Sequence, residues 1–308
     1  MSELPDVVLW AIPFFLVTLL AEVALARRTK RVRYETRDTW ASLSMGAGNL
    51  VVGLLFGGIA YAAYDAVYQF RLFEIGYTWW AFVLCFFAED LAYYWFHRIA
   101  HERRWFWASH VPHHSSQSYN LSTALRQPWT GILTGTFIWH LPLPLLGFPP
   151  AMILFFQGTS LVYQYWIHTE AIARTPRWFE ALFNTPSHHR VHHATNPRYL
   201  DANYAGVLIV WDRLFGSFIG EIDEDRPRYG IVKQLSSHNP LVIAFHEWVA
   251  IARDLAAARS LRESAGYLLG PPGWSPDGSR QTTADIKAAW RAEGQPNAGA
   301  QASAEADC

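Results

Sequence analysis

The stretch HRIAHERRWFWASHVPHH, residues 97–114, is the part of the sequence that determines the predicted fold. It contains the pattern HxxxH followed by HxxHH, and HxxHH returns in HRVHH, residues 189–193. Residues three and four apart share one face of a helix, about 5–6 Å apart. Each cluster can therefore direct two or three imidazoles at one point. The eight histidines are His97, His101, His110, His113, His114, His189, His192 and His193.

The composition is typical of a membrane protein. Of 308 residues, 51% are hydrophobic and 17% charged, and the chain has 15 Trp and 14 Tyr. Such aromatic side chains gather in belts at membrane interfaces. The net charge of -1 creates no field that attracts nucleic acid, so we expect no nucleic-acid partner. Cys85 and Cys308 provide neither a disulfide framework nor a thiolate metal site.

Apolar segments predict an all-α integral membrane protein with four to five transmembrane helices. Residues 4–26 form a first span, which lacks the cleavage site of a signal peptide. Residues 43–64 and 77–96 form two further spans. Residues 129–147 and 150–167 form a hairpin, either two short spans or one pair that enters part way.

The basic loop RRTKRVRYETR, residues 27–37, orients these spans. Loops rich in Lys and Arg stay in the cytoplasm, so this loop is predicted to be cytoplasmic. Alternate crossings then bring all three histidine clusters to the cytoplasmic face. We therefore expect a multi-pass protein in which a cytosolic helical cap holds a dinuclear metal site.

Four regions are predicted along the chain. Residues 1–39 form the N-terminal transmembrane helix with its basic cytoplasmic loop, and residues 40–220 form the membrane domain with the histidines. Residues 221–268 contain an amphipathic helix that can lie along the membrane. Residues 269–308, rich in Pro, Gly, Ala and Ser, are expected to be a disordered tail.

Eight imidazoles are twice the number that one tetrahedral ion binds, which predicts two metal ions. Imidazole binds zinc, copper, iron and nickel alike, so the spacing does not select the element. Ordinary capping histidines do not explain three repeated patterns at one face. His168, with Gln164 one turn before it, is a predicted ninth ligand, with a structural role as the alternative. Structural or supporting roles are expected for His140, His188, His238 and His246.

Two carboxylates are the predicted catalytic residues. Asp90 lies in an apolar span before His97, where an ionisable group is costly without a partner. Metal-bound histidines commonly donate their other N–H to such a carboxylate, although hydrogen bonding between helices is an alternative. Glu102 directly follows His101 and could bind the metal, orient a ligand or bind substrate. The alternative for Glu102 is a solvated interfacial charge.

In order, spacing and membrane placement, the clusters resemble the three histidine boxes of the fatty acid hydroxylase and sterol desaturase superfamily. The flanking sequences are similar to those of its alkylglycerol monooxygenase branch. The similarity covers roughly residues 40–220. The sequences that carry it are HRIAHE (97–102), HHSSQSYNLSTALRQ (113–127), QYWIHTE (164–170) and NTPSHHRVHHATNPRYLDANYAGVLIVWDRLFGSF (184–218).

The resemblance implies a mixed-function oxidase with a non-haem di-iron centre held by the eight box histidines. It also implies that Glu102 matters for activity and that residues 120–127 lie near the active site. Members of this branch use tetrahydrobiopterin as reductant and hydroxylate the ether carbon of a glyceryl ether. The resulting hemiacetal collapses to a fatty aldehyde and glycerol.

The sequence carries no dinucleotide fingerprint, no CxxCH haem attachment and no flavin motif, so electrons must come from an external donor. The prediction is thus an O2-dependent lipid monooxygenase whose partners are a lipid, a membrane and an electron donor. Hydroxylation or desaturation of a fatty acyl, sterol or other lipid within the same superfamily is the alternative. A zinc-dependent membrane hydrolase and a metal transporter are alternatives from other classes.

Overall fold

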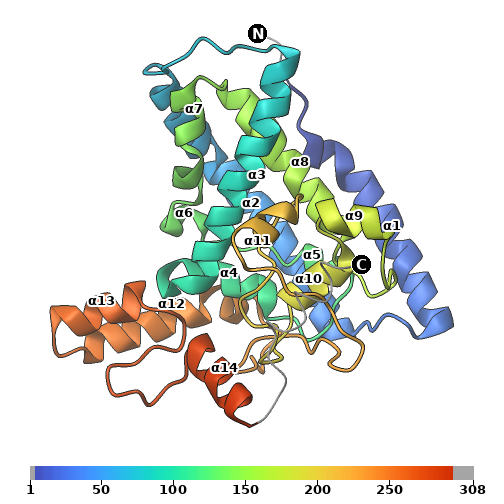
Figure 1. Cartoon of the computed structure of the whole chain (residues 1–308), viewed down its shortest axis with the longest axis vertical. Helices are drawn as coiled ribbons and strands as arrows, with labels where there is room; N and C mark the ends of the chain where they lie inside the picture. Colours follow the sequence, from blue (N-terminus) through green and yellow to red (C-terminus); the bar gives the residue numbers. More distant parts are fainter. Residues whose placement is uncertain (1–3, 294–308) are drawn as a thin grey trace.

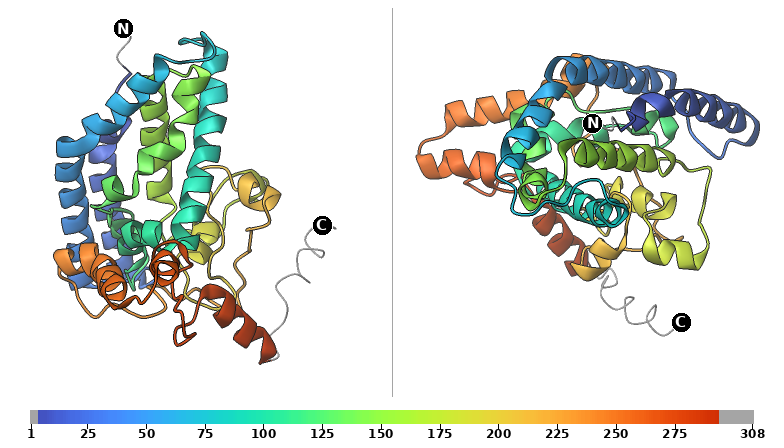
Figure 2. Two further views of the ribbon diagram at one scale, coloured as in Figure 1. Left: turned by 90° about the vertical axis from the view of Figure 1, so that its left-hand side faces the viewer. Right: turned by 90° about the horizontal axis from the view of Figure 1, so that it is seen from above.

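The computed structural model describes residues 4–293, which are helical and contain no strand. Four long helices lie side by side, and short helices that carry histidines gather at one end of them (Figure 1). The two views in Figure 2 show the same bundle from the side and from above. The long helices are α1 (Val7–Thr29), α2 (Thr36–Tyr68), α3 (Trp79–Glu102) and α8 (Pro150–Trp166).

Side-chain caps define where the first two helices begin. Asp6 accepts hydrogen bonds from the backbone N–H groups of Val8 and Leu9, both at 3.1 Å, and Glu35 caps α2 in the same way. Within residues 4–293, α1 and α2 are the helices long and apolar enough to cross a membrane. They coincide with the first two predicted spans, so the all-α class and two candidate spans are confirmed.

Helices α3 and α8 coincide with two more of the predicted spans. Helix α3 continues past the apolar segment to Glu102, and its last turns carry His97 and His101. Helix α8 packs against α1, α2 and α3, and His168 follows its last turn. One long helix thus leads directly into the first histidine cluster, and another leads to His168.

Residues 129–147 differ from the predicted short span because they form three helical pieces. Gly135, with φ of 60°, separates the first two pieces, and Pro142 begins the third. A Cβ on Gly147 would lie 2.1 Å from the carbonyl oxygen of Phe73, so only glycine fits at this turn. The chain still travels away from the histidines and returns in α8, as predicted for a hairpin (Figure 1). The pieces are α6 (Gly131–Thr134), η1 (Thr136–His140) and α7 (Pro142–Leu146).

A layer of shorter helices closes the lower end of the bundle. Helices α12 and α13 pair beneath α4, and α14 follows them (Figures 1 and 2). Helix α12 occupies the predicted amphipathic segment. The helices of this end are α4 (Arg104–His114), α5 (Leu121–Ala124), α9 (Arg177–Leu182), α10 (Pro186–His192), α11 (Val210–Leu214), α12 (Pro240–Ala257), α13 (Leu261–Leu269) and α14 (Thr283–Ala292).

The prediction of a disordered tail from residue 269 is wrong for residues 269–293. Helix α14 begins with a capping box between Thr282 and Asp285, and Arg280 binds Asp254 of α12 at 2.6 Å. Charged contacts, and not an apolar face, attach this polar segment to the protein. Residues 294–308 lie outside the described residues.

Candidate metal centre

Nine histidines converge beneath the helix bundle in two adjacent groups. Within each group, one nitrogen of every imidazole lies within 4.8 Å of the others. The rings of His114 and His193, one from each group, stack with centroids 4.3 Å apart. The first group contains His97, His101, His110, His114 and His192, and the second contains His113, His168, His189 and His193.

The groups do not follow the sequence clusters. The HxxxH pair of α3 enters the first group together, as its shared helix face predicts. Each HxxHH cluster, however, is divided between both groups: His110 and His114 face one point, whereas His113 faces the other. Helix α4, and helix α10 with its C-cap His193, therefore contribute imidazoles to both groups.

The spacing between imidazole nitrogens fits metal coordination. The Nε2 atoms of His97 and His110 are 2.9 Å apart, and those of His113 and His168 are 3.1 Å apart. With a metal–nitrogen bond of about 2.1 Å, two nitrogens bound at a right angle lie about 3.0 Å apart. The buried Nε2 atoms of His101, His192 and His193 have no hydrogen-bond partner within residues 4–293. These donors fit a pair of transition-metal ions.

Backbone carbonyls hold the outer nitrogen of several imidazoles. The Nδ1 atoms lie near the carbonyl oxygens of Tyr204 for His97, at 2.7 Å, and of Ala202 for His192, at 2.9 Å. A carbonyl can only accept, so Nδ1 carries the proton and Nε2 keeps its lone pair for a metal. His113 and His168 are held in the same way by the carbonyls of Arg126, at 3.2 Å, and Gln164, at 2.7 Å.

Burial lowers the pKa values of several of the converging imidazoles, which favours their neutral form. Loss of hydration lowers the pKa of His113 to about 4. It also lowers the pKa values of His114 and His189 well below 6.5, with the neighbouring histidines adding to the effect. Since a metal binds the neutral imidazole, these ligands need not lose a proton near neutral pH.

Asp90 does not support a ligand histidine, so that prediction is wrong. Its carboxylate accepts hydrogen bonds from the backbone N–H groups of Val207, at 2.9 Å, and Leu208, at 3.0 Å, and from Nε1 of Trp211, at 2.9 Å. The hydrogen-bond donors to the buried Asp90 carboxylate thus come from the chain that follows α10. Asp90 thus attaches α3 to this loop.

Glu102 lies beside the site and not in contact with the imidazoles described. Its carboxylate accepts from Nε of Arg98 at 2.8 Å, one turn earlier on α3. The side chain keeps 35% of its surface exposed. This environment agrees with the alternative of a solvated interfacial charge, and no contact of the described residues gives Glu102 a metal-binding role.

The carboxylate that does approach one of the nine converging histidines is Asp201, which sequence reasoning missed. Its Oδ1 lies 3.5 Å from Nδ1 of His101. Asp201 is a hundred positions away from His101 along the chain, whereas Asp90 and Glu102 were selected because they are near in sequence. No local spacing could have paired Asp201 with His101.

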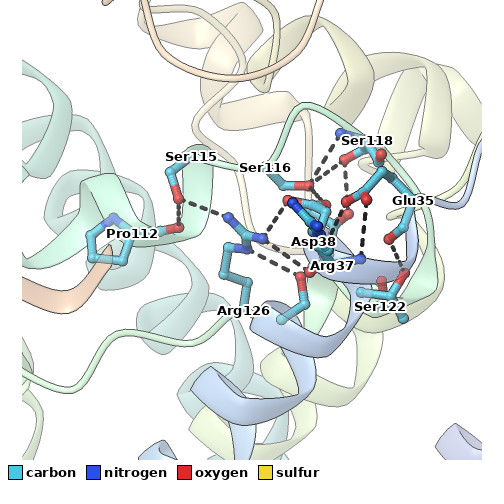
Figure 3. Close-up of polar contacts among 12 residues, drawn as sticks. Glu35, Arg37, Asp38, Pro112, Ser115, Ser116, Ser118, Ser122 and Arg126 are labelled. Atoms are coloured by element: carbon cyan, nitrogen blue, oxygen red, sulfur yellow. Dashed lines mark hydrogen bonds and ion pairs between the residues drawn. The ribbon is translucent and has the colours of Figure 1, made fainter. Parts of the chain in front are cut away.

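Arg126 connects the site to α2. The buried guanidinium binds Oδ1 of Asp38 at 2.5 Å and the hydroxyl of Ser115 at 3.0 Å (Figure 3). Because the carbonyl oxygen of Arg126 also holds His113, this buried ion pair positions a histidine of the second group. The structure thereby brings part of residues 120–127 to the site.

A cavity of about 720 Å³ lies against both groups of histidines. His101 and His192 of the first group and His193 of the second line its inner wall. Residues of α12 and α14 and residues 230–235 also line the cavity. Its walls combine apolar side chains with charged ones, so a small amphipathic molecule could reach both groups from here.

The remaining histidines lie outside both groups, as predicted. His188 packs edge-on against the ring of Phe218, with centroids 5.3 Å apart. His140 lies 3.6 Å from Glu89, higher in the bundle. His246 belongs to α12 and lines the cavity, and His238 is exposed.

The region that holds the site also matches a known family. Residues 82–217, which contain all nine converging histidines, match the family model described as fatty acid hydroxylase. This part of the chain is therefore similar to fatty acid hydroxylases. The family match thus coincides with α3, the short histidine helices and α8.

Several proteins to which this chain is similar have names that state a lipid substrate. Alkylglycerol monooxygenase of Homo sapiens is 37% identical over 281 residues, which are 90% of this chain and 62% of that protein. The Danio rerio protein of the same name is 36% identical over 89% of this chain and 61% of its own length. Ornithine lipid hydroxylase OlsE of Rhizobium tropici is 30% identical over 42% of this chain and 39% of its own.

The chain therefore spans about three fifths of the length of the alkylglycerol monooxygenases that it matches. No solved structure matches this chain.

Proposed function

We propose that this chain is a membrane-bound lipid monooxygenase that uses O2 and an external reductant. The observation that carries the proposal is the pair of adjacent groups of buried imidazoles inside the region that is similar to fatty acid hydroxylases. The four-membered group includes His168, which supports its role as a ninth ligand. Histidines that gather at one end of the bundle do not line a path through it, which disfavours a metal transporter.

Each group would hold one iron ion. An all-imidazole donor set also suits zinc or copper, and the family similarity is the reason to prefer iron. When bound, the two ions would supply the activation of O2 that oxidation of an unactivated C–H bond requires. The chain supplies neutral imidazoles, fixes their tautomers with backbone carbonyls and excludes water from them by burial.

We infer that four to five membrane segments surround the lipid route, with α1, α2, α3 and α8 crossing and residues 129–147 accompanying them. The basic loop between α1 and α2 lies at the histidine end, where Nδ2 of Asn120 donates to the carbonyl oxygen of Arg33 at 2.8 Å (Figure 1). By the distribution of positive charge, this end faces the cytoplasm. The carbon of a bilayer lipid that is to be oxidised would then lie at the membrane boundary, near the histidines.

The proposed substrate is a glyceryl ether. Similarity to alkylglycerol monooxygenases over most of this chain supports it, whereas the shorter similarity to the ornithine lipid hydroxylase supports the alternative of hydroxylation on another lipid. Hydroxylation of the ether carbon would release a fatty aldehyde and glycerol.

The reductant would be tetrahydrobiopterin or another external electron donor. The cavity supports this, since histidines of both groups line it together with residues of α12 and α14. Its size is within the range of pockets that bind small cofactors.

The test uses purified protein in lipid nanodiscs, loaded anaerobically with Fe²⁺ and supplied with O2 and tetrahydrobiopterin. An alkylglycerol, a fatty acid and a sterol are offered separately, and products are identified by mass spectrometry. We expect fatty aldehyde from the alkylglycerol only with iron, O2 and reductant together. Turnover with zinc and without O2 would instead establish a hydrolase.

A further inference from the structure

Asp201 differs from the other residues that contact the outer nitrogens of the converging histidines, because it does so with a carboxylate. Four of these imidazoles have Nδ1 near a backbone carbonyl, but His101 faces the Asp201 carboxylate at 3.5 Å. Across residues 4–293, it is the one carboxylate that pairs with any of the nine. The opposite nitrogen of this ring, Nε2 of His101, is buried without a partner and belongs to the first group.

The backbone around Asp201 is held in an uncommon conformation. Asp201 has φ of 50° and Asn203 has φ of 56°, both in the left-handed region. The Asn203 amide donates to the carbonyl oxygens of His188, at 3.0 Å, and Ile219, at 2.8 Å, which stabilises the turn. Strained residues persist where surrounding contacts over-determine them, and they concentrate at functional sites.

The same turn supports the first group of histidines at further points. The carbonyl of Ala202 lies against Nδ1 of His192, and that of Tyr204 lies against Nδ1 of His97. Residues 201–204 therefore provide the outer contacts of three imidazoles in one group. We find no corresponding contact to the second group among the residues that the structure describes.

Helix α14 holds the Asp201 carboxylate from the other side. The Thr283 hydroxyl donates a hydrogen bond to it, and the Lys287 ammonium interacts with it electrostatically. The chain just before Thr283 is attached by Arg280, which binds both carboxylate oxygens of Asp254 on α12, at 2.7 and 2.6 Å. The C-terminal segment thus reaches a ligand histidine through one carboxylate.

We propose that Asp201 is a positioning residue: its carboxylate, held by Thr283 of α14, accepts a hydrogen bond from the Nδ1–H group of His101 and so directs Nε2 of His101 at the metal of the first group. This inference rests on the proposed metal centre. It assigns a function to a turn and a C-terminal helix that lie outside the three histidine patterns. Loss of the carboxylate weakens one metal site and leaves the other unchanged.

The experiment titrates metal-free protein with Co²⁺ and follows the visible absorption of the bound ion, with metal content measured by mass spectrometry. Asp201→Gly keeps the backbone freedom that φ of 50° requires and removes the acceptor. Asp201→Asn keeps a neutral acceptor. Groups that hold a ligand histidine typically contribute about 10- to 100-fold to metal affinity.

We expect Asp201→Gly to lower the affinity of one Co²⁺ by about 10- to 100-fold while the second ion binds as in the wild type. Asp201→Asn should restore part of the loss, and Thr283→Val should give a smaller loss at the same site. The control is Asp277→Asn, because Asp277 is exposed and bonds within its own turn to Ser279.

The inference would be overturned if Asp201→Gly bound each of the two Co²⁺ ions with the same affinity as the wild type. Equal weakening of both sites would overturn it as well, because it would indicate a general structural effect. If Asp201→Gly fails to fold, the same measurement is made on Asp201→Asn and Thr283→Val, and the inference requires that they weaken one Co²⁺ site and leave the other unchanged. Failure of the wild-type protein to bind two ions would instead count against the proposed function.

Discussion

At the scale of single residues, neighbours in sequence serve different metal positions. His113 and His114 are adjacent on α4, yet their side chains belong to the second and first groups. Successive residues on a helix point about 100° apart, so one imidazole turns toward each group. A dinuclear site built this way depends on the rotation of α4 as much as on its position.

We expect His114→Ala and His113→Ala to lose different metal ions. Each variant should retain about one metal per chain and fall to background activity, since the proposed reaction needs both ions. Metal analysis and aldehyde release provide the measurements. His238→Ala, which removes an exposed histidine, serves as the control and should behave as the wild type. Retention of two ions in either α4 variant would argue against the ligand assignment.

Glu102 provides a second test at this scale. Because its carboxylate pairs with Arg98 beside the first group, Glu102→Gln removes the charge but keeps the shape. We expect lower activity with the metal content retained, which would establish a role in turnover. An unchanged rate would leave Glu102 as a solvated ion pair, consistent with its 35% exposure.

At the scale of helices and loops, buried ion pairs join segments that are distant in sequence. Arg126 connects the segment after α5 to Asp38 of α2, and Arg104 connects α4 to Glu247 and Asp254 of α12. Removing one partner of a buried pair typically destabilises a protein by about 3–5 kcal/mol, because the other charge is left uncompensated. The pair of Arg126 and Asp38 thus holds the histidine layer against α2, and Arg104 holds α4 against α12.

Asp254 allows the C-terminal attachment to be measured. Hydrogen bonds from Arg280 and Arg104 lower the pKa of Asp254 from 3.8 to about 2. A lowered pKa in the folded state stabilises the fold above the unfolded value, and this contribution disappears as pH falls through about 2. We therefore expect docking of residues 271–293 to be insensitive to pH between about 5 and 8.

Asp254→Asn should release this segment even at neutral pH, which faster hydrogen exchange of residues 271–293 would reveal. Exchange in α8 should stay unchanged, since α8 lies on the other side of the histidines. If the variant and the wild type exchange at the same rate, the ion pair with Arg280 contributes little to attachment.

At the scale of the whole molecule, the bundle separates an apolar end from a charged end. Helices α1 and α2 expose apolar side chains along most of their length. The loop between α1 and α2, the short helices α4 and α10, and helices α12 to α14 lie together at one end of the bundle (Figure 2). A bilayer around the apolar helices would bring its boundary close to the metal centre.

This arrangement predicts membrane sidedness. In a cysteine-free background, Arg31→Cys and His238→Cys, both at exposed positions of the histidine end, should react with an impermeant maleimide only from the cytoplasmic side. Gly76→Cys, in the loop between α2 and α3 at the other end, should react only from outside (Figure 1). Labelling of all three from one side would contradict four to five crossings.

Sequence alone determined what depends on local spacing and polarity. The HxxxH face of α3, the apolar lengths of α1 and α2, and the histidine-rich set of candidate ligands follow from periods and residue types that act within one helix. The resemblance in the boxes identified the family for the same reason, since its signature is local. Where a partner lay far along the chain, local reasoning failed, as with Asp90 and the attachment of α14.

Tertiary structure alone decided how these parts combine. It divided the HxxHH clusters between two groups, gave Asp90 to the backbone of residues 207–208 and brought Asp201 to His101. Each outcome depends on which buried polar group finds which partner once the chain is compact, because an unpaired buried group is too costly to keep. Spacing in the sequence therefore predicted which imidazoles could bind metal, and packing decided which ones lie in the same group.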